Sequence, residues 1–229
     1  PKAEWLAALL QQQLRSQGEP VSVSPMPAAG QFRLEWALPK QPPGVQVVIP
    51  SKDQAILLGR CLDSLQRTCH AYPNLQITVV DHASREPATA ALLSTWRVRL
   101  GCRLQVHRMG GAFNWSKFNN HAIRKGRSPL VLLLNNDVEA LSEGWLEVMV
   151  AQALRPAIGA VGAVLLYPDR RIQHVGIGLG HGLERCGPEH AYRGLSWPAG
   201  VHRGRAQLLS GWPAVTGACL MVRREEWQR

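Results

Sequence analysis

One stretch of the chain, Leu130–Leu134, is an unbroken apolar run, Leu-Val-Leu-Leu-Leu. A half-exposed strand alternates apolar and polar side chains, whereas a strand covered on both faces of a sheet reads as a continuous apolar run. Such strands lie at the centre of parallel sheets that carry helices on both faces. The run therefore predicts a layered α/β fold built around this strand.

Apolar runs and helical patterns alternate from residue 45 onward. We predict strands at residues 45–49, 75–80, 104–107 and 130–134, and helices at residues 56–65, 87–100 and 115–125. Alternation at a spacing of about 30 residues is typical of right-handed βαβ units, which build a mostly parallel sheet flanked by helices. A helix at residues 145–154, a strand at 160–167, a glycine-rich and loop-like region to residue 211 and a final strand at 214–222 follow.

The first 44 residues predict a small α+β appendage. A helical spacing of apolar residues precedes two short alternating segments, residues 21–23 and 32–36. Residues 38–44 are rich in proline and read as a stiff connector. We therefore predict two parts, an N-terminal segment at residues 1–44 and a main domain at residues 45–229.

Composition disfavours several classes of protein. The net charge is +10, but the densest basic run is only Arg124, Lys125 and Arg127, so we expect no nucleic-acid partner. The five cysteines are scattered and form no C-x-x-C pair, so we expect free thiols rather than disulfides or a zinc site. Neither a membrane-spanning apolar run nor a signal peptide is recognisable, which favours a cytoplasmic location.

Polar residues follow three of the predicted strands directly. These segments are Pro50-Ser51-Lys52-Asp53, Asp81-His82-Ala83-Ser84 and Asn135-Asn136-Asp137. Ligands of open α/β sheets bind beyond the carboxyl ends of the strands, so these side chains are candidate site residues. No glycine follows the first strand and the chain has no G-x-x-x-x-G-K-[ST], which disfavours NAD dehydrogenases and P-loop NTPases.

The two carboxylates at these strand ends each have two interpretations. Asp137, flanked by two amides, offers hard oxygen ligands for Mg²⁺ or Mn²⁺ carrying a diphosphate, but aspartate is also favoured where a strand turns. Asp81 could bind a base or ribose, or cap the helix that follows. The residues alone leave these alternatives open.

Six segments in order resemble the family 2 glycosyltransferases of bacterial O-antigen and surface-polysaccharide assembly, including rhamnosyltransferase-like members. They read VVIPSKD, ITVVDHAS, FNWSKFNN, LVLLLNNDVEALSEGWL, IGAVGAVLLYPDRRIQHVGIGLG and AVTGACLMVRREEW. The resemblance covers residues 45–229 and implies a Rossmann-like GT-A fold. It implies transfer of a sugar from a UDP- or dTDP-sugar to a glycan or lipid-linked acceptor. Residues 1–44 resemble the stretch before this domain in longer, multi-domain members.

The resemblance also implies roles for individual residues. It places Pro50, Ser51 and Asp53 in the first nucleotide-contacting loop, and Asp81, followed by Ser84, at the carboxylate that contacts the base. The family's DXD-type element corresponds to Asn135, Asn136 and Asp137, so Asp137 would hold the metal and the asparagines would contact the sugar nucleotide.

A further donor-binding segment contains Asn114, Lys117, Asn119 and Asn120, where the family usually has N-x-G and a later asparagine. The chain reads Phe113-Asn114-Trp115 instead, which leaves the individual contacts open. A cation near the start of a helix suits a diphosphate, although Lys117 equally reads as a surface residue.

His174 matches a recurring family motif and is a further candidate metal ligand, because histidine is the commonest metal ligand. A hydrogen bond to the backbone is the more frequent role of a loop histidine. His181 and His190 are weaker candidates.

The resemblance implies an inverting reaction in which a carboxylate deprotonates the acceptor hydroxyl. The family's general base follows the last matching segment, so we expect it beyond Arg229. Glu225 and Glu226 are the nearest acids, but a position in a first helical turn explains them better.

Alternative functions remain. One is a catalytically silent nucleotide-sugar binding module of a larger protein. A sugar-phosphate nucleotidyltransferase would need a glycine-rich, arginine-containing loop that Ser51-Lys52-Asp53 is not. The positive charge is compatible with a peripheral position at the inner face of an anionic membrane.

Overall fold

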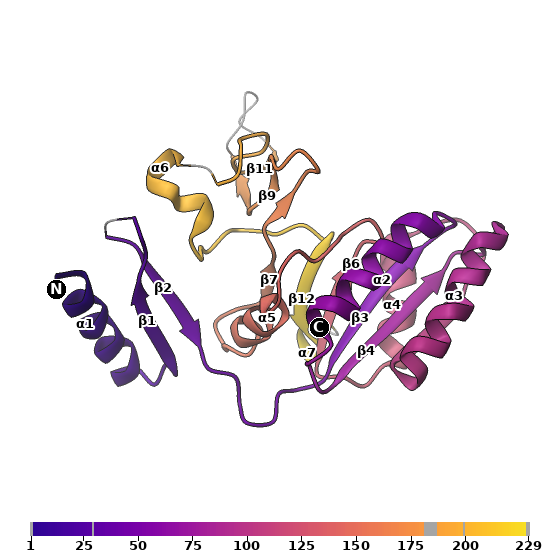
Figure 1. Cartoon of the computed structure of the whole chain (residues 1–229), viewed down its shortest axis with the longest axis horizontal. Coiled ribbons are helices and arrows are strands. Elements are labelled where there is room, and N and C mark those ends of the chain that lie inside the picture. The colour runs from indigo at the N-terminus through magenta and orange to yellow at the C-terminus, as the bar shows by residue number, and fades with distance from the viewer. Residues whose placement is uncertain (1, 29, 181–186, 199, 228–229) are drawn as a thin grey trace. The chain divides into compact units, whose positions relative to one another are not determined.

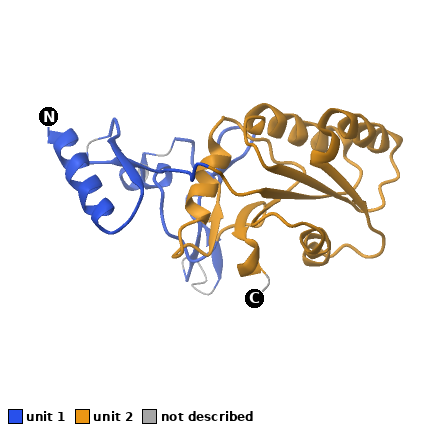
Figure 2. Cartoon of the chain, turned by 90° about the horizontal axis from the view of Figure 1, so that it is seen from below, with its two compact units in different colours: residues 1–40, 164–214 blue, residues 41–163, 215–229 orange. Residues whose placement is uncertain are grey.

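The computed structural model describes residues 2–28, 30–180, 187–198 and 200–227. The chain divides into two compact units (Figure 2). Unit 1 contains residues 1–40 and 164–214, and unit 2 contains residues 41–163 and 215–229. The division at residue 44 stays a prediction.

Unit 2 is built on a six-stranded sheet of order β5-β4-β3-β6-β12-β7 (Figure 1). Its strands are β3 (Val45–Ser51), β4 (Leu75–Asp81), β5 (Leu104–Arg108), β6 (Leu130–Leu134), β7 (Ala160–Gly162) and β12 (Cys219–Arg223). β3 pairs in parallel with β4 and β6, and β4 with β5, whereas β12 runs antiparallel to β6 and β7. The predicted α/β class with a mostly parallel sheet is confirmed, and all five residues of β6 are buried.

Helices flank this sheet. They are α2 (Ala55–Cys69), α3 (Pro87–Leu100), the short 3-10 helix η1 (Gly101–Arg103), α4 (Trp115–Lys125), α5 (Trp145–Ala153) and α7 (Arg224–Trp227). α4 buries Phe118 and Ile123 against Val48, Val131 and Val222, which lie on one face of the sheet. α2 contacts α3, and it accepts a hydrogen bond from the Trp145 indole of α5. Successive side chains of a strand point to opposite faces of the sheet. α4 covers one face, and α2, α3 and α5 cover the other.

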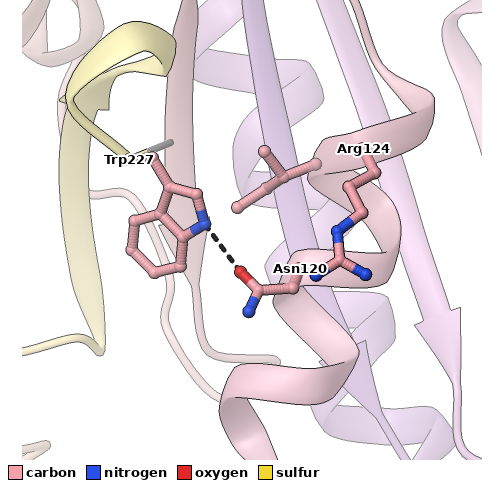
Figure 3. A pocket seen from close by; sticks show the side chains of 4 residues that line it. Asn120, Arg124 and Trp227 are labelled. Atoms are coloured by element: carbon pink, nitrogen blue, oxygen red, sulfur yellow. Dashed lines mark hydrogen bonds between the residues drawn. The ribbon is translucent and has the colours of Figure 1, made fainter. Parts of the chain in front are cut away.

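The last helix, α7, packs against α4. The Trp227 indole Nε1 donates to Asn120 Oδ1 at 2.7 Å (Figure 3). The rings of Trp115 and Trp227 are 6.4 Å apart and meet edge to face. Gly217 permits this packing, because a Cβ there would lie 2.9 Å from the Trp115 ring.

A polar network closes the amino ends of the parallel strands. The Gln46 side chain is 2% exposed; its Nε2 donates to the carbonyl of Ala122 at 3.1 Å. Its Oε1 accepts from Arg224 Nη2 at 2.7 Å. Arg224 also donates to the carbonyls of Ser128 and Ile123, and burial lowers the pKa of its guanidinium. The start of α7 is thereby joined to β3 and to α4 by charge-assisted hydrogen bonds.

Unit 1 contains the predicted helix and strand pair and a second group of short elements. α1 (Lys2–Ser16) precedes the antiparallel pair β1 (Val21–Pro25) and β2 (Phe32–Trp36). The second group comprises β8 (Leu165–Leu166), β9 (Ile172–His174), β10 (Ile177–Leu179), β11 (Pro188–His190), α6 (Val201–Gly204) and the 3-10 helix η2 (Arg205–Gln207). β8 pairs with β9 and β10 with β11, both antiparallel.

Two predicted strands were wrong in their bounds. The apolar segment 160–167 is not one strand, because it ends in the large sheet as β7 and resumes as β8 beside β9. The final strand begins at Cys219 rather than at residue 214. The carbonyl of Ala214 accepts from the N–H of Ile177 in unit 1, and that of Ala218 accepts from Asn135. Hydrophobicity does not reveal where a strand changes its pairing partner.

None of the helices within the described ranges is long and apolar enough to cross a membrane. Cys61, Cys69, Cys102 and Cys219 are free thiols, as predicted. Cys186 lies outside the described residues.

Candidate functional site

The carboxyl ends of β3, β4 and β6 meet at one edge of the sheet. Ser51 and Asp81 are the last residues of β3 and β4 and are neighbours in register. Asn136, just after β6, donates from Nδ2 to Ser51 Oγ at 3.0 Å. The structure thus brings together side chains that the sequence predicted from three separate strands.

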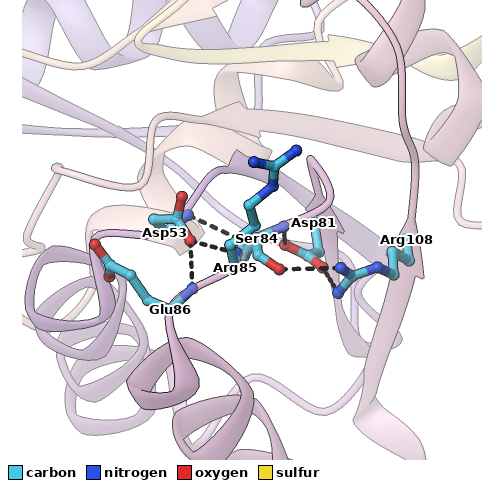
Figure 4. A network of polar contacts seen from close by, with 6 residues as sticks. All are labelled: Asp53, Asp81, Ser84, Arg85, Glu86 and Arg108. Carbon is cyan, nitrogen blue, oxygen red and sulfur yellow. Dashed lines mark hydrogen bonds and ion pairs between the residues drawn. The ribbon is translucent and has the colours of Figure 1, made fainter.

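Asp53 ties the loop after β3 to the loop after β4 (Figure 4). Its backbone N–H donates to Ser84 Oγ at 2.7 Å. Its Oδ1 accepts from the backbone N–H groups of Arg85, at 2.7 Å, and Glu86, at 2.9 Å. These bonds, that from Glu86 first, lower the pKa of Asp53. One carboxylate oxygen of Asp53 therefore holds the chain just before α3, and φ of 52° at this residue shapes the turn.

Asp81 is 4% exposed and is held by two partners (Figure 4). Its Oδ1 accepts from the backbone N–H of Ser84 at 3.0 Å. Its Oδ2 forms an ion pair with Arg108 Nη1 at 3.0 Å. Arg108 Nη2 also donates to the carbonyl of Ser84 at 3.0 Å. The guanidinium therefore fixes both the carboxylate and the loop beyond it.

Sequence reasoning missed Arg108, although a signal was present. Arg108 directly follows the predicted strand at residues 104–107, so the strand-end rule applied to this strand would have found it. His82 belongs to the predicted segment Asp81-His82-Ala83-Ser84, but no role was predicted for it. Its Nε2 lies 2.7 Å from the carbonyl of Gly111, and its ring contacts Phe118 edge to face. It connects the end of β4 to the loop before α4.

Asp137 differs from the other carboxylates of this edge because it is exposed and forms no hydrogen bond or ion pair with the described residues. Burial, and next the negative charge of Asp137, raises the pKa of Cys61 to about 12, so this thiol stays neutral. Cys61 lies beneath the strand end, with Sγ 3.8 Å from the carbonyl of Asn135.

The fit of this edge to a divalent cation depends on Asp137. The described ranges contain no group of three or more His, Cys, Asp or Glu side chains that could hold a metal. A single free carboxylate suits a cation such as Mg²⁺ that takes its other ligands from phosphate and water. The residues present therefore fit a metal that arrives with a diphosphate.

The predicted residues around α4 have partners within the protein. Asn114 caps the helix, with Oδ1 accepting from the backbone N–H of Lys117 at 2.9 Å. Lys117 is exposed in the first turn. Asn119 is fully buried and donates to the carbonyl of Trp115, and the oxygen of Asn120 is occupied by Trp227. Donor contacts by these residues stay predictions.

His174 lies in unit 1 and is 1% exposed. Its Nδ1 is 3.1 Å from Nδ1 of His190, which is also 3.2 Å from the carbonyl of Gln173. Burial, and next the charge of His190, lowers the pKa of His174 to about 4, so it is neutral near pH 7. A metal role for His174 stays a prediction, and His181 lies outside the described residues.

The acids nearest the end of the chain face an arginine. Arg223 Nη2 pairs with Glu226 at 3.1 Å, and its Nε lies 3.6 Å from Glu225. Arg223 Nη1 donates to carbonyls at the end of α5, those of Ala153, Arg155 and Ile158. Glu225 and Glu226 are therefore both explained as ion-pair partners of Arg223. A general base beyond Arg229 stays a prediction.

Comparison with known proteins identifies a matching family and several similar proteins. The family described as "Glycosyl transferase family 2" matches residues 46–225. O-antigen biosynthesis protein RfbC of Myxococcus xanthus is 33% identical over 219 residues, which cover 96% of this chain and 16% of that protein. Uncharacterized protein y4gI of Sinorhizobium fredii (strain NBRC 101917 / NGR234) is 38% identical over 213 residues, 90% of this chain and 22% of that protein.

Among solved structures, the mannosyltransferase PcManGT from Pyrobaculum calidifontis, in complex with GDP-Man and Mn²⁺, aligns with a TM-score of 0.47 and 23% identity. The alignment covers 72% of this chain and 45% of that one.

The chain spans only 16% and 22% of the lengths of the two curated relatives that it matches.

Proposed function

Because the chain belongs to glycosyl transferase family 2, we propose that it binds a nucleoside-diphosphate sugar at the carboxyl ends of β3, β4 and β6 and transfers the sugar to a glycan or lipid-linked acceptor. The observation that carries the proposal is the meeting of Ser51, Asp81 and Asn136 beside the exposed Asp137. The fold is the mostly parallel sheet of the GT-A type. The O-antigen relative supports surface-polysaccharide assembly as the setting, with further domains in a longer protein.

The donor would lie along this edge with its nucleoside over β4. Asp81, oriented by Ser84 and Arg108, keeps lone pairs that can accept hydrogen bonds from a base, which suits UDP or dTDP. Lys117 stands in the first turn of α4, where a helix N-terminus and a cation both favour phosphate. The amide groups of Asn135 and Asn136 supply neutral contacts beside it.

A divalent cation, Mg²⁺ or Mn²⁺, would be held by Asp137 and by the diphosphate itself. When bound, it supplies positive charge that stabilises the departing nucleoside diphosphate. Asp137 would bind and orient this cation.

The proposed transfer is inverting, with a carboxylate beyond Arg229 removing the proton of the acceptor hydroxyl. Glu225 and Glu226 are engaged with Arg223 and are not assigned this role. We also retain the proposals that the protein acts in the cytoplasm, near the inner face of the membrane, and that nucleic acid is not a partner.

A donor titration tests the proposal. The chain is titrated calorimetrically with UDP- and dTDP-sugars, with MnCl₂ and then with EDTA. We expect dissociation constants between about 1 μM and 1 mM, weakened at least about tenfold when the metal is removed. Ser84→Ala and Asn136→Ala should weaken binding, whereas Ser94→Ala, at an exposed position on α3, is the matched control. Failure of every nucleotide sugar to bind would contradict the proposal.

One competing function is a silent donor-binding module of a larger protein. Transfer and donor hydrolysis measured in a protein extended beyond Arg229 separate the two. Tight donor binding without turnover in the extended protein would identify the silent module.

A further inference from the structure

The stretch from Pro87 to Asn136 contains none of the chain's 16 acidic residues but eight of its 26 lysines and arginines. It forms α3, β5, α4 and β6. Arg99 and Arg108 are paired with acids from outside the stretch, Asp63 and Asp81. The cations of α4, Lys117, Arg124 and Lys125, form no ion pair with any described residue. The surface of α4 therefore carries uncompensated positive charge.

Cations in the last turn of a helix ordinarily serve its carbonyl end. In α4 that need is met from inside the protein. The carbonyl of Ala122 accepts from Gln46, and the carbonyl of Ile123 accepts from the guanidinium of Arg224. Arg124 and Lys125 are thus not required as caps, and the partly buried charge of Arg224 offsets the negative end of the helix dipole.

A pocket of about 280 Å³ opens between α4 and α7, lined by Asn120, Ile123, Arg124 and Trp227 (Figure 3). An indole N–H can only donate, so its bond to Asn120 fixes the amide with Oδ1 toward Trp227. Asn120 Nδ2 therefore remains a donor. Arg124 has only donors and no described partner, so the polar lining of this pocket offers hydrogen-bond donors and positive charge.

Two neighbouring histidines respond to this positive charge rather than add to it, since the pKa of each is lowered, first by burial and next by Lys125. The His107 ring of β5 lies 5.4 Å from the His121 ring of α4. Burial, followed by the charges of Lys125 and Arg124, lowers the pKa of His121. Those two cations therefore act on this face of the protein, and the acids of α7, Glu225 and Glu226, are each paired with Arg223.

We propose that this pocket binds a phosphate group, with Arg124 and Asn120 Nδ2 donating to its oxygens and the Ile123 and Trp227 side chains contacting the attached carbon atoms. Small-molecule sites usually measure about 300–1,000 Å³, so this pocket suits a phosphate with a short carbon attachment rather than a whole nucleotide sugar. The lining of this pocket includes none of the strand-end residues Ser51, Asp81, Asn136 and Asp137, although Asn120 is also one of the residues predicted to contact the donor. The phosphate belongs to a lipid headgroup or to a soluble phosphate ester.

The test uses the Trp227 indole N–H signal in a ¹H–¹⁵N spectrum, assigned with Trp227→Phe. Inorganic phosphate is titrated into the chain, and separately vesicles of phosphatidylglycerol or of phosphatidylcholine are added. Asn120→Asp keeps an acceptor for Trp227 but replaces the donor with a negative charge. Together with Arg124→Gln, it should weaken phosphate binding at least about tenfold.

Matched controls place the same charge changes on helices of the opposite face. Gln66→Glu on α2 and Arg97→Gln on α3 are both at exposed positions and should leave binding within about twofold of the unmodified chain. Thermal unfolding of every variant shows whether it is folded, and Arg124→Gln, at a surface position, is the variant least able to disturb the fold.

Two outcomes support the site and identify its source. Saturable binding of inorganic phosphate without preference for phosphatidylglycerol indicates a soluble ester. Arg124-dependent binding to phosphatidylglycerol vesicles, reversed by inorganic phosphate, indicates a headgroup. The proposal is overturned if the Trp227 signal does not move in either arm, if it moves equally in Asn120→Asp, or if only the Asn136 side-chain amide responds, which would place phosphate at the donor edge. That last reporter keeps failure of this site distinguishable from failure of the proposed function.

Discussion

The two ends of the parallel strands in unit 2 carry polar networks of opposite character. At the amino ends, the Gln46 amide and the Arg224 guanidinium meet acceptors and donors of the protein itself. At the carboxyl ends, hydrogen bonds also join the loops, yet Asp137 remains exposed and without a described partner. A network that is satisfied internally stabilises the fold, whereas one that leaves a charge open is available to a ligand.

The sharpest test of this contrast is Asp137→Ala in a full-length protein. We expect transfer to fall at least about a hundredfold, because the cation loses its protein ligand. The melting temperature should stay nearly unchanged, because the side chain is exposed. Activity and thermal unfolding are measured together, with Glu143→Ala, an exposed acid in the following loop, as the control. Unaltered transfer would remove Asp137 from the site.

Arg224→Met should show the reverse pattern at the amino ends. It leaves Gln46 Oε1 and the carbonyl of Ser128 without their donor and removes one of two donors to the carbonyl of Ile123, so we expect the free energy of unfolding to fall by about 2–4 kcal/mol. Donor affinity should be unchanged. Urea unfolding compared with Arg127→Met, an exposed arginine nearby, measures the effect. A loss of donor affinity in a folded Arg224→Met protein would break the division between the two ends.

The expected effect of Arg108→Met lies between those of Asp137→Ala and Arg224→Met. The exposed guanidinium adds about 1 kcal/mol or less to stability, but it orients Asp81 and the Ser84 loop. We expect about tenfold weaker donor binding, measured by calorimetry, with Arg97→Met as control. Arg108→Lys should restore part of the affinity only, because an ammonium cannot reproduce the two-pronged contact. Equal affinities for all four proteins would limit Arg108 to a surface role.

The smallest effect concerns Asp53 and pH. Its folded pKa lies below the ordinary 3.8, because backbone N–H groups bind the carboxylate. Its stabilising contribution is therefore fully present above pH 3.8 and is lost as the pH falls through the lower folded pKa. Urea unfolding should find Asp53→Asn less stable than the unmodified chain near neutral pH, with the difference shrinking in strong acid. A difference independent of pH would contradict the charge argument.

Much of the fold was predictable, because buried strands and amphipathic helices leave strong local patterns. The bounds of β6, α3 and α4 agree with the prediction, and α3 has Pro87 as its first residue. The antiparallel direction of β12 was not predictable, since its apolar residues look the same in either direction. Its start at Cys219 depends on pairing between Ala218 and Asn135, which lie far apart in the chain.

The donor edge was predicted from one rule, that ligands bind beyond the carboxyl ends of strands. That rule identified Ser51, Asp81 and Asn136, but it gave no partner for any of them. The amino-end network was invisible in advance, because Gln46 and Arg224 are separated by 178 positions. Polar Gln46 within an apolar strand was the one local sign that a buried network exists.

The chain leaves unit 2 after β7 and returns to it before β12, and the excursion between them, residues 164–214, belongs to unit 1. Where it leaves and returns, Gly162 lies against the Val215 side chain. The two ends of this excursion are thus held together by the sheet. Loop-closure entropy grows only logarithmically with length, by about 0.6 kcal/mol for each doubling. Changes in the length of the excursion therefore carry little thermodynamic penalty for the sheet, so the stability of the strand ends around Asp137 depends little on how long this segment is.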